Sequence, residues 1–325
     1  MTTVDEYARF CGALRTEFGT PGRRIEDVDA IADKAKAKSK VSARGLRVPK
    51  GRTYRVEELT SLRRGFAALT GEFGPSIIIK PLGASGCVGV SHIRSESEFD
   101  AWLKSPKVSD MFEVEEFFDG DLYHFDAFVL KGSIVGTYVW KYCNPMLKFL
   151  SGLPTGSISL PRTDETFQQI NAFGTEALHA LGLSDGSIHM EVFRNKSGEL
   201  CYLEAGPRTP GITQHHVYLR TYGINYVDVD LQIALGQCPD LPQDELTHGF
   251  WMIWPQKPGL VQGYAYPAND VELHMSGEML PGETAVQPTS IKYKSCQIDG
   301  FHRDFRVLND AFRRISAGAN PLKVA

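Results

Sequence analysis

The sequence lacks the features that would place it in several large classes of protein. Its six cysteines among 325 residues form no CxxC pair, so neither a disulfide scaffold nor a zinc site is indicated. No stretch approaches the roughly 18 to 20 consecutive apolar residues that cross a bilayer. The first residues carry acids where a signal peptide has a basic start. We therefore expect a cytoplasmic protein without a membrane partner.

The chain also has little excess of charge of either sign. Its 35 Lys and Arg and 39 Asp and Glu give a net charge of -4, which provides no overall attraction to nucleic acid. The imbalance is local, because eleven basic residues between 34 and 64 meet only Glu57 and Glu58. Aromatic residues are nearly absent there. A solvated helix face beside an anionic site is therefore favoured over a nucleic-acid surface, and no nucleic-acid partner is expected.

Hydrophobic periodicity predicts a mixed α+β chain with about two domains' worth of sequence. The elements that we expect, in chain order, are a helix that ends at 45, strands over 76–82, 112–118, 123–130 and 133–142, a helix over 164–181, a β-hairpin over 187–206 and a helix over 304–316. The turn signals Asp119-Gly120 and Lys131-Gly132 separate the three strands in the middle of this list. They predict an antiparallel meander.

A glycine-rich loop follows the first expected strand. Lys80 closes the strand, and Gly83, Gly86 and Gly89 punctuate a loop that also contains Ser85. Such glycines let backbone N–H groups approach phosphate oxygens, and a lysine at the strand end adds a fixed positive charge. The pattern is neither a Walker A motif nor a dinucleotide-binding fingerprint. A merely flexible hairpin explains the glycines equally well.

Two glutamates lie inside apolar runs of the expected hairpin, Glu191 in HMEVF and Glu204 in YLEAG. Hairpin pairing brings residues about a dozen apart together across the ladder. Two carboxylates on one sheet face suit Mg²⁺, although either could instead pair with a Lys or Arg or face solvent. Arg208 follows between two prolines, where it could clamp a carboxylate or phosphate or form an ion pair with one of these glutamates.

The order of these motifs carries more information than any one of them. Asp33-Lys34, Lys80 with its glycine loop, an adjacent acid pair at 115 and 116, and the Glu191, Glu204 and Arg208 set follow one another along the chain. This order resembles the ATP-grasp superfamily, in particular carboxylate–amine ligases of the dipeptide-forming L-amino-acid ligase type. In those enzymes a helix that opens with Asp-Lys ends in G-[VI]-x-x-P, and here the segment ends in Gly-Leu-Arg-Val-Pro at 45–49. The resemblance runs from about Gly22 to Gly236.

The resemblance implies an ATP-grasp fold in which two α+β subdomains grip ATP between them. Residues 1–40 would be a helical linker, 41–114 a lid subdomain and 115–325 the C-terminal subdomain. By position, the resemblance implies that Lys34 and Lys80 contact the phosphates and that Gly83, Ser85 and Gly86 belong to the closing loop. The adenine hinge would be Glu115, Glu116, Phe117 and Phe118, and the ribose would contact Asp121 or His124. Glu191 and Glu204 would bind Mg²⁺, and Arg208 would face the transferred phosphoryl group. The implied cofactors are ATP and Mg²⁺, for which Mn²⁺ can substitute.

The sequence departs from the family pattern at three places. Leu122 stands where many members have a ribose-binding Glu, so Asp121 or His124 must substitute for it. The segment from Glu204 to Arg208 lacks the usual Asn ligand, which makes a second Mg²⁺ depend on bridging by Glu204. The family also has a Rossmann-like domain of roughly a hundred residues before the Asp-Lys helix. We expect that domain to be lost, to be supplied by another chain, or to lie outside this sequence.

The implied reaction converts a carboxylate of an amino acid to an acyl phosphate and passes it to an amine, with release of ADP and phosphate. The expected partners are a small-molecule carboxylate and amine, together with a second copy or a chain that supplies the missing domain. An ATP-grasp kinase that acts on a hydroxyl and a non-catalytic ATP-binding subunit are the alternatives. The side chains that we expect around the substrates are Tyr138, Trp140, Lys141, His215, His216 and Arg220.

Overall fold

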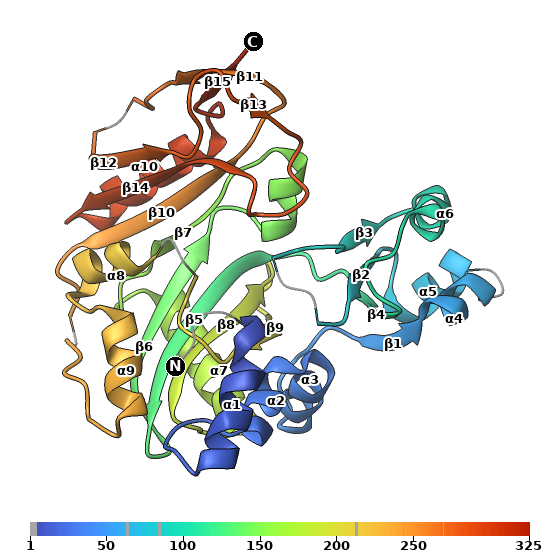
Figure 1. Ribbon diagram of the computed structural model, residues 1–325, viewed down its shortest axis with the longest axis horizontal. Coiled ribbons are helices and arrows are strands. Elements are labelled where there is room, and N and C mark those ends of the chain that lie inside the picture. Colours follow the sequence, from blue (N-terminus) through green and yellow to red (C-terminus); the bar gives the residue numbers. More distant parts are fainter. Residues whose placement is uncertain (1–4, 63–64, 84–85, 212–213, 243, 269) are drawn as a thin grey trace.

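Two β-sheets of different size organise the chain. The computed structural model describes residues 5–62, 65–83, 86–211, 214–242, 244–268 and 270–325. A small lobe built on one sheet projects from the side of a larger body built on the other (Figure 1). Helices and strands occur in both parts, so the expected α+β class is confirmed. Among the described residues, no helix has both the length and the apolar character needed to cross a membrane.

The small lobe is a four-stranded antiparallel sheet with helices packed on it. Its strands lie in the order β1-β4-β2-β3. Its elements are β1 (Gly51–Arg55), α4 (Val56–Ser61), α5 (Gly65–Phe73), β2 (Ile77–Pro81), β3 (Ser91–Ile93), α6 (Glu96–Lys104) and β4 (Met111–Glu116). The alternating β-branched residues Ile77 and Ile79 point into a core that also holds Phe99, Phe112 and Val114. The strand expected at 76–82 is β2.

The larger body is built on an eight-stranded sheet in the order β12-β14-β10-β7-β6-β5-β8-β9. Its strands are β5 (Asp121–Leu130), β6 (Ser133–Tyr142), β7 (Thr155–Ser159), β8 (Gly186–Arg194), β9 (Leu200–Gly206), β10 (His248–Pro255), β12 (Glu272–Gly277) and β14 (Lys294–His302). A further small sheet holds β11 (Gly259–Tyr264), β13 (Thr284–Ala285) and β15 (Leu322–Val324). The hairpin predicted over 187–206 is confirmed as β8 and β9.

Helices cover the large sheet on both faces. On one face α7 (Glu165–Leu181) packs against β5 and β8, and its N-cap Asp164 accepts from the backbone of the first turn. On the other face lie α8 (His215–Tyr222) and α9 (Tyr226–Ala234), whose aromatic residues meet those of β6. The 3₁₀ segment η1 (Met146–Ser151) and α10 (Phe305–Ala317) complete the body. The helices predicted over 164–181 and 304–316 are therefore confirmed.

Three helices precede the small lobe: α1 (Asp5–Phe18), α2 (Ile25–Ala32) and α3 (Lys34–Ala43). We expected one helix that ends at 45 and carries Val28, Ile31, Ala35 and Ala37 on one side, but the structure divides it into α2 and α3. Gly45 follows α3 at φ +83°, which an L side chain rarely adopts. Asp33 separates α2 from α3 and caps α3, because its side chain accepts from the backbone of Ala35 and Lys36. This cap fixes Lys34 as the first residue of the helix.

The predicted meander is wrong at one strand. β4 pairs with β1 and β2 in the small sheet, whereas β5 pairs with β6 and β8 in the large one. The residues between them, 117–120, therefore connect the two sheets instead of closing a hairpin. An Asp-Gly step predicts a turn but cannot say whether the strands on either side of it pair. The connection lies beside the site described next.

Candidate active site

The two hairpin glutamates lie directly opposite each other. Glu191 of β8 pairs in register with Glu204 of β9, so both side chains leave the same face of the large sheet. Burial, and then the charge of Glu204, raise the pKa of Glu191 to about 7. Burial acts in the same direction on Glu204, but the charges of Lys34 and Lys80 outweigh it and lower the pKa of Glu204 to about 2. The two carboxylates thus lie side by side, and the protein stabilises the charged form of Glu204 but not that of Glu191.

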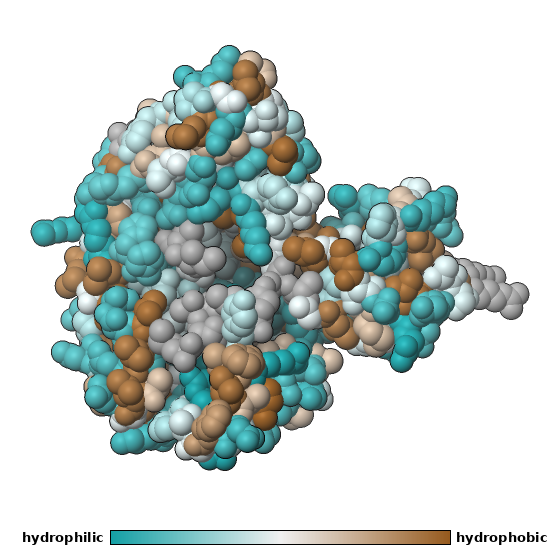
Figure 2. Space-filling model, in the orientation of Figure 1, coloured by the Kyte–Doolittle hydropathy of each residue, from teal (hydrophilic) through white to brown (hydrophobic). Residues whose placement is uncertain are grey.

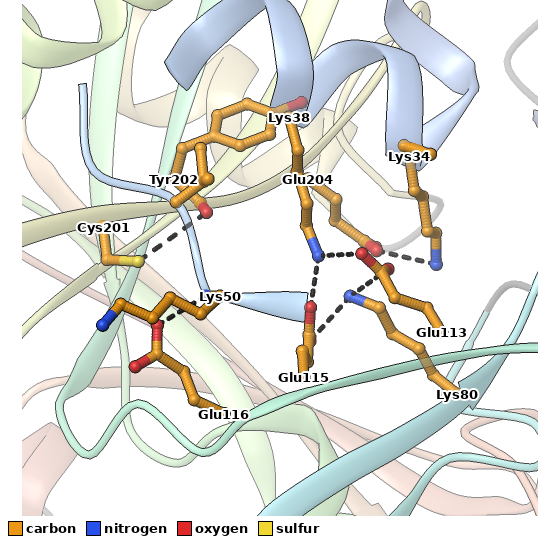
Figure 3. A network of polar contacts seen from close by, with 12 residues as sticks. Lys34, Lys38, Lys50, Lys80, Glu113, Glu115, Glu116, Cys201, Tyr202 and Glu204 are labelled. Carbon is orange, nitrogen blue, oxygen red and sulfur yellow. Dashed lines mark hydrogen bonds and ion pairs between the residues drawn. The ribbon is translucent and has the colours of Figure 1, made fainter. Parts of the chain in front are cut away.

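Two cations and a tyrosine from separate segments of the chain lie around this pair. The ammonium group of Lys34, at the start of α3, lies 2.8 Å from Glu204 Oε2 (Figure 3). Arg208, just beyond β9, donates to the carbonyl oxygen of Thr209 at 2.9 Å, and its charge acts to lower the pKa of Glu191. Tyr142 donates its hydroxyl to Glu191 Oε1 at 3.1 Å. The structure therefore brings together Lys34, Glu191, Glu204 and Arg208 from separate parts of the sequence.

A second, more deeply buried cluster lies beside the first (Figure 3). Lys38 of α3 forms ion pairs with Glu113, at 2.8 Å, and with Glu115 of β4. Lys80 of β2 forms ion pairs with the same two carboxylates, at 3.3 Å to Glu113 and 2.8 Å to Glu115. All four side chains are 7% exposed or less. We call this set of two lysines and two glutamates the buried quartet.

Lys80 links the buried quartet to the glutamate pair. Its pKa is raised, because Glu115, Glu113 and Glu204 together outweigh the cost of burial. Among the described residues, its Nζ atom finds ion-pair partners but no well-aligned hydrogen-bond acceptor. An ammonium group with unused donors is suited to phosphate oxygens. Sequence analysis missed Lys38 and Glu113. The signals were visible, because Lys38 lies one helical turn after Lys34, and Glu113 lies on the same face of its strand as Glu115.

Several described residues of the glycine-rich loop after β2 have positive φ angles. Gly83, Gly86 and Gly89 have φ values of +80°, +62° and +72°, and Cys87 has a φ of +61°. A side chain added at Gly86 would contact Ile291 of the large body at 3.5 Å, so the loop reaches across from the small lobe. The charges of Glu191, Glu204 and Lys34 act on the thiol of Cys87, which puts the loop beside the glutamate pair. Ser85 lies outside the described residues.

The predicted hinge residues are engaged with protein groups. Glu116 accepts from Arg47 Nη2 at 2.5 Å and from the backbone of Lys50 at 2.6 Å. Phe117 is partly exposed and stacks on His92 with ring centroids 4.0 Å apart. The Phe118 ring lies 6.0 Å from that of Phe193 in β8. The adenine role of 115–118 remains a prediction, and the Glu115 side chain lies in the buried quartet.

The structure separates the two side chains proposed for the ribose. Asp121 is exposed and pairs with Lys141 at 2.6 Å, so it stays available to a ligand at the surface. His124 is fully buried, and its two ring nitrogens bond to Asp126, at 2.8 Å, and Ser157, at 2.8 Å. The ribose role predicted for His124 is therefore wrong. Asp126 also accepts from His189 and from the hydroxyl of Tyr218.

The residues expected around the substrates do not form one group. Tyr138 and Trp140 are buried against Tyr218 and Tyr222 of α8, where they build the core. The remaining side chains hold ion-pair or ring contacts: Lys141 with Asp121, His216 with Asp299 at 2.7 Å, Arg220 with Glu272, and His215 with His216. A strand of alternating aromatic and polar residues does not reveal by itself which face a helix will cover.

The donor set at Glu191 and Glu204 fits a hard divalent cation. Both ligand groups are carboxylates, which Mg²⁺ prefers over nitrogen and sulfur. Burial, and then the charge of Glu204, raise the pKa of Glu191, and a bound cation would offset both effects. Tyr142 orients Glu191 and Lys34 orients Glu204. The residues present therefore suit Mg²⁺ together with an anionic ligand.

Solved structures with the same architecture define the class of this fold. An L-amino acid ligase from Bacillus licheniformis superposes with a TM-score of 0.77 at 18% identity, covering 100% of this chain and 80% of the other. A carboxyaminoimidazole ribonucleotide synthase from Aspergillus clavatus, complexed with ATP, superposes with a TM-score of 0.69 at 12% identity, covering 95% and 78%. Both are ATP-grasp proteins, and this chain has the ATP-grasp fold.

Sequence comparison finds distant similarity to two curated proteins. No family model matches the chain. It is 23% identical over 273 residues to an L-arginine-specific L-amino acid ligase of Bacillus subtilis, which covers 81% of this chain and 64% of that protein. An uncharacterized protein of Sinorhizobium fredii is 24% identical over 247 residues, covering 73% and 48%. The chain thus spans about half to two thirds of the length of the curated relatives it matches.

Proposed function

We propose that the chain is an ATP-dependent ligase that joins the carboxylate of an amino acid to an amine, with release of ADP and phosphate. The observation that carries this proposal is the register of Glu191 against Glu204, flanked by Lys34 and Arg208, in an ATP-grasp fold. The similarity to a protein named as an L-arginine-specific L-amino acid ligase supports an amino acid as the carboxylate substrate.

The charges at the site suit phosphoryl transfer to a carboxylate. The reaction brings a triphosphate and a carboxylate together, so cations must offset their repulsion. Lys34 and Lys80 would bind phosphate oxygens, and in doing so Lys34 would leave Glu204. Arg208 would hold the reacting carboxylate against the terminal phosphate through its planar guanidinium. Mg²⁺, held by Glu191 and Glu204, would supply further positive charge to the phosphates when bound.

The glycine-rich loop would protect the reaction product of the first step. A carboxylate oxygen attacks the γ-phosphorus, the bond to ADP breaks, and an acyl phosphate remains. Water hydrolyses acyl phosphates readily, so the site must exclude it until the amine attacks the carbonyl carbon and phosphate leaves. Gly83, Gly86 and Gly89 give the loop the backbone freedom for such closure. Asp121 is still our candidate for binding the ribose. Residues 41–114 are still our proposed lid subdomain.

The test is a product assay with ATP, Mg²⁺ and pools of amino acids. We expect ADP and phosphate to rise together only when both a carboxylate and an amine are present. AMP and pyrophosphate would contradict the acyl-phosphate route. A phosphorylated product without free phosphate would identify a phosphotransferase, and tight ATP binding without turnover would identify a non-catalytic subunit. Replacing Mg²⁺ with Mn²⁺ in the same assay tests the exchange of metals.

A further inference from the structure

His189 of β8 is a buried side chain that the proposed reaction does not use. It lies two residues before Glu191, so both side chains leave the same face of the large sheet. Its Nε2 atom is 4.0 Å from Glu191 Oε1, which is too far for a hydrogen bond. A ring nitrogen thus lies beside the glutamate pair without bonding to Glu191.

The partner of the other ring nitrogen fixes the tautomer of His189. Asp126 Oδ1 lies 2.6 Å from His189 Nδ1, and an ionised carboxylate can only accept, so Nδ1 carries the proton. A neutral imidazole that donates from Nδ1 has its lone pair on Nε2. Burial, the largest effect, lowers the pKa of His189 and favours this neutral form. The lone pair is therefore on the nitrogen next to Glu191.

Asp126 is held in place by two further donors. His124 donates to it from Nδ1, and Tyr218 donates its hydroxyl. His124 also bonds through Nε2 to Ser157 Oγ at 2.8 Å. His124, Asp126 and His189 lie close enough to hold an ion among themselves, but these bonds already occupy the atoms that would ligate it. His189 Nε2 takes no part in them, so it is available to a metal.

The pairing of β8 with β9 leaves room beside His189. Glu191 lies opposite Glu204, and His189 lies opposite Gly206, which has no side chain. Gly206 is also the position of the missing Asn, so a ligand from His189 would reach the side of the site that lacks one. The Glu204 side chain is 38% exposed, and the surface is hollowed where the small lobe meets the larger body (Figure 2), so a dissolved ion can approach.

We propose that His189 Nε2 is a third ligand of the metal ion at Glu191 and Glu204, and that the site therefore prefers Mn²⁺ to Mg²⁺. This inference rests on the metal site of the proposed function and adds a nitrogen to its two carboxylates. Two atoms that bind one ion at about 2.1 Å are roughly 3 to 4 Å apart, which matches the 4.0 Å between His189 Nε2 and Glu191 Oε1. Mg²⁺ takes oxygen ligands, whereas first-row transition metals also bind imidazole.

Asp126 acts in this arrangement as a positioning residue. A histidine that binds a metal usually donates its other ring N–H to a carboxylate, which fixes the ring and makes the free nitrogen more basic. His189 and Asp126 form this pair at 2.6 Å. A histidine that only packs in the core would make the same bond, so the tests must detect the metal itself.

The first test detects the nitrogen directly and needs no variant. The protein is produced with ¹⁵N in its histidines alone and is loaded with Mn²⁺ and the β,γ-methylene analogue of ATP, without amino acids. Pulsed electron paramagnetic resonance then identifies the nuclei bound to the metal, and we expect hyperfine coupling to ¹⁵N. Bound Mn²⁺ without this coupling would overturn the proposal and leave the ligase reaction untouched. Mn²⁺ that does not bind would overturn both this proposal and the metal site.

The second test compares the affinities for Mn²⁺ and Mg²⁺ by calorimetry with the same ATP analogue. His189→Gln keeps an amide donor for Asp126 but removes the ring nitrogen, so the preference for Mn²⁺ should fall by at least about tenfold. His248→Gln is the matched control, because this half-buried histidine packs on Phe305, and it should keep the wild-type preference.

Circular dichroism checks that each variant is folded, and the ¹⁵N measurement decides the question if His189→Gln is not. The ¹⁵N coupling should also disappear in a folded His189→Gln. A preference for Mn²⁺ that is the same in wild type and His189→Gln would overturn the proposal. Equal loss of preference in His248→Gln would overturn it as well, because the effect would then not depend on the position of the histidine.

Discussion

The buried quartet and the glutamate pair are neighbours that handle buried charge in opposite ways. The quartet sets two lysines against two glutamates, and every member has two partners of opposite sign within the chain. In the glutamate pair, Glu204 forms an ion pair with Lys34, but Glu191 accepts a hydrogen bond from the neutral hydroxyl of Tyr142. The charges of the quartet are balanced within the protein, although Lys80 Nζ keeps unused hydrogen-bond donors. The pair is left with a carboxylate whose pKa is raised to about 7, which a bound cation can relieve.

This difference assigns stability mainly to the quartet, of which only Lys80 would also contact a ligand, and metal binding to the pair. The quartet joins α3 to the small sheet, since Lys38 comes from the helix and Glu113 and Glu115 come from β4. The pair lies on the adjoining edge of the large sheet. Changes in the quartet should therefore be measured chiefly in unfolding, and changes in the pair chiefly in binding and turnover.

The largest effect is expected from Glu204→Ala, which removes a proposed metal ligand and the partner of Lys34. Turnover should fall by at least about a thousandfold, since the loss leaves phosphate charge without its cation. The melting temperature should stay near that of wild type. Glu176→Ala is the matched control, because this glutamate is exposed and pairs with Arg44 at 2.8 Å on the surface. Retained activity in Glu204→Ala would refute the metal assignment.

The buried quartet should respond in stability. Glu113→Gln leaves two buried lysines with one full carboxylate, which should lower the free energy of unfolding by about 3 to 5 kcal/mol. Urea denaturation measures this change. Adding Lys38→Met restores equal numbers of the two charges and should recover a large part of the loss. If the double variant is no more stable than Glu113→Gln, charge balance is not what holds the quartet.

The pH dependence of stability should distinguish the pair from the quartet. The pKa of Glu191 is raised to about 7 from an ordinary value of 4.5, so the unfolded chain gives up this proton first. Metal-free wild type should therefore lose stability as pH rises from about 5 to 7, by about 1 to 2 kcal/mol, and level off above 7. Glu191→Gln should remove this slope. A slope that is identical in both proteins would place the titration elsewhere.

The smallest effect is expected at Tyr142, a buried side chain that donates a hydrogen bond to Glu191. Tyr142→Phe removes the hydrogen bond to Glu191 Oε1 and keeps the ring in its buried place. Metal affinity should fall by about tenfold, as is typical when a partner of a metal ligand is lost. Calorimetry with Mn²⁺ and a non-hydrolysable ATP analogue measures it without turnover. Tyr264→Phe is the control, since that hydroxyl bonds to Met279 and Ser295 far along the chain.

Local signals in the sequence were sufficient for the hairpin and for the pairing of its acids. The Lys-Ser-Gly turn between two alternating strands fixed both the strands and the opposition of Glu191 and Glu204. The helix predicted over 164–181 is α7, which begins at the N-cap Asp164. The ATP-grasp fold followed from the order of motifs, and the solved structures confirm it.

Contacts between distant segments were not predictable in the same way. Lys38 and Glu113 are 75 residues apart, and nothing local to either one specifies the other. The Asp-Gly step after β4 predicted a hairpin because its turn chemistry is the same whether or not the flanking strands pair. His124 lay at a position suited to the ribose along the chain, but in the sheet it lies opposite Glu191, is fully buried and bonds to Asp126 and to Ser157 of β7. Long-range pairing decided all three cases.

The most direct test of the proposed reaction follows one oxygen atom. Amino acids labelled with ¹⁸O in the carboxylate are incubated with the protein, ATP, Mg²⁺ and an amine, and the phosphate released is analysed by mass spectrometry. An acyl phosphate requires the carboxylate oxygen to bond to phosphorus and to leave with it, so each phosphate formed should carry one ¹⁸O. Label in AMP, or phosphate without label, would contradict the proposed ligase chemistry at the glutamate pair.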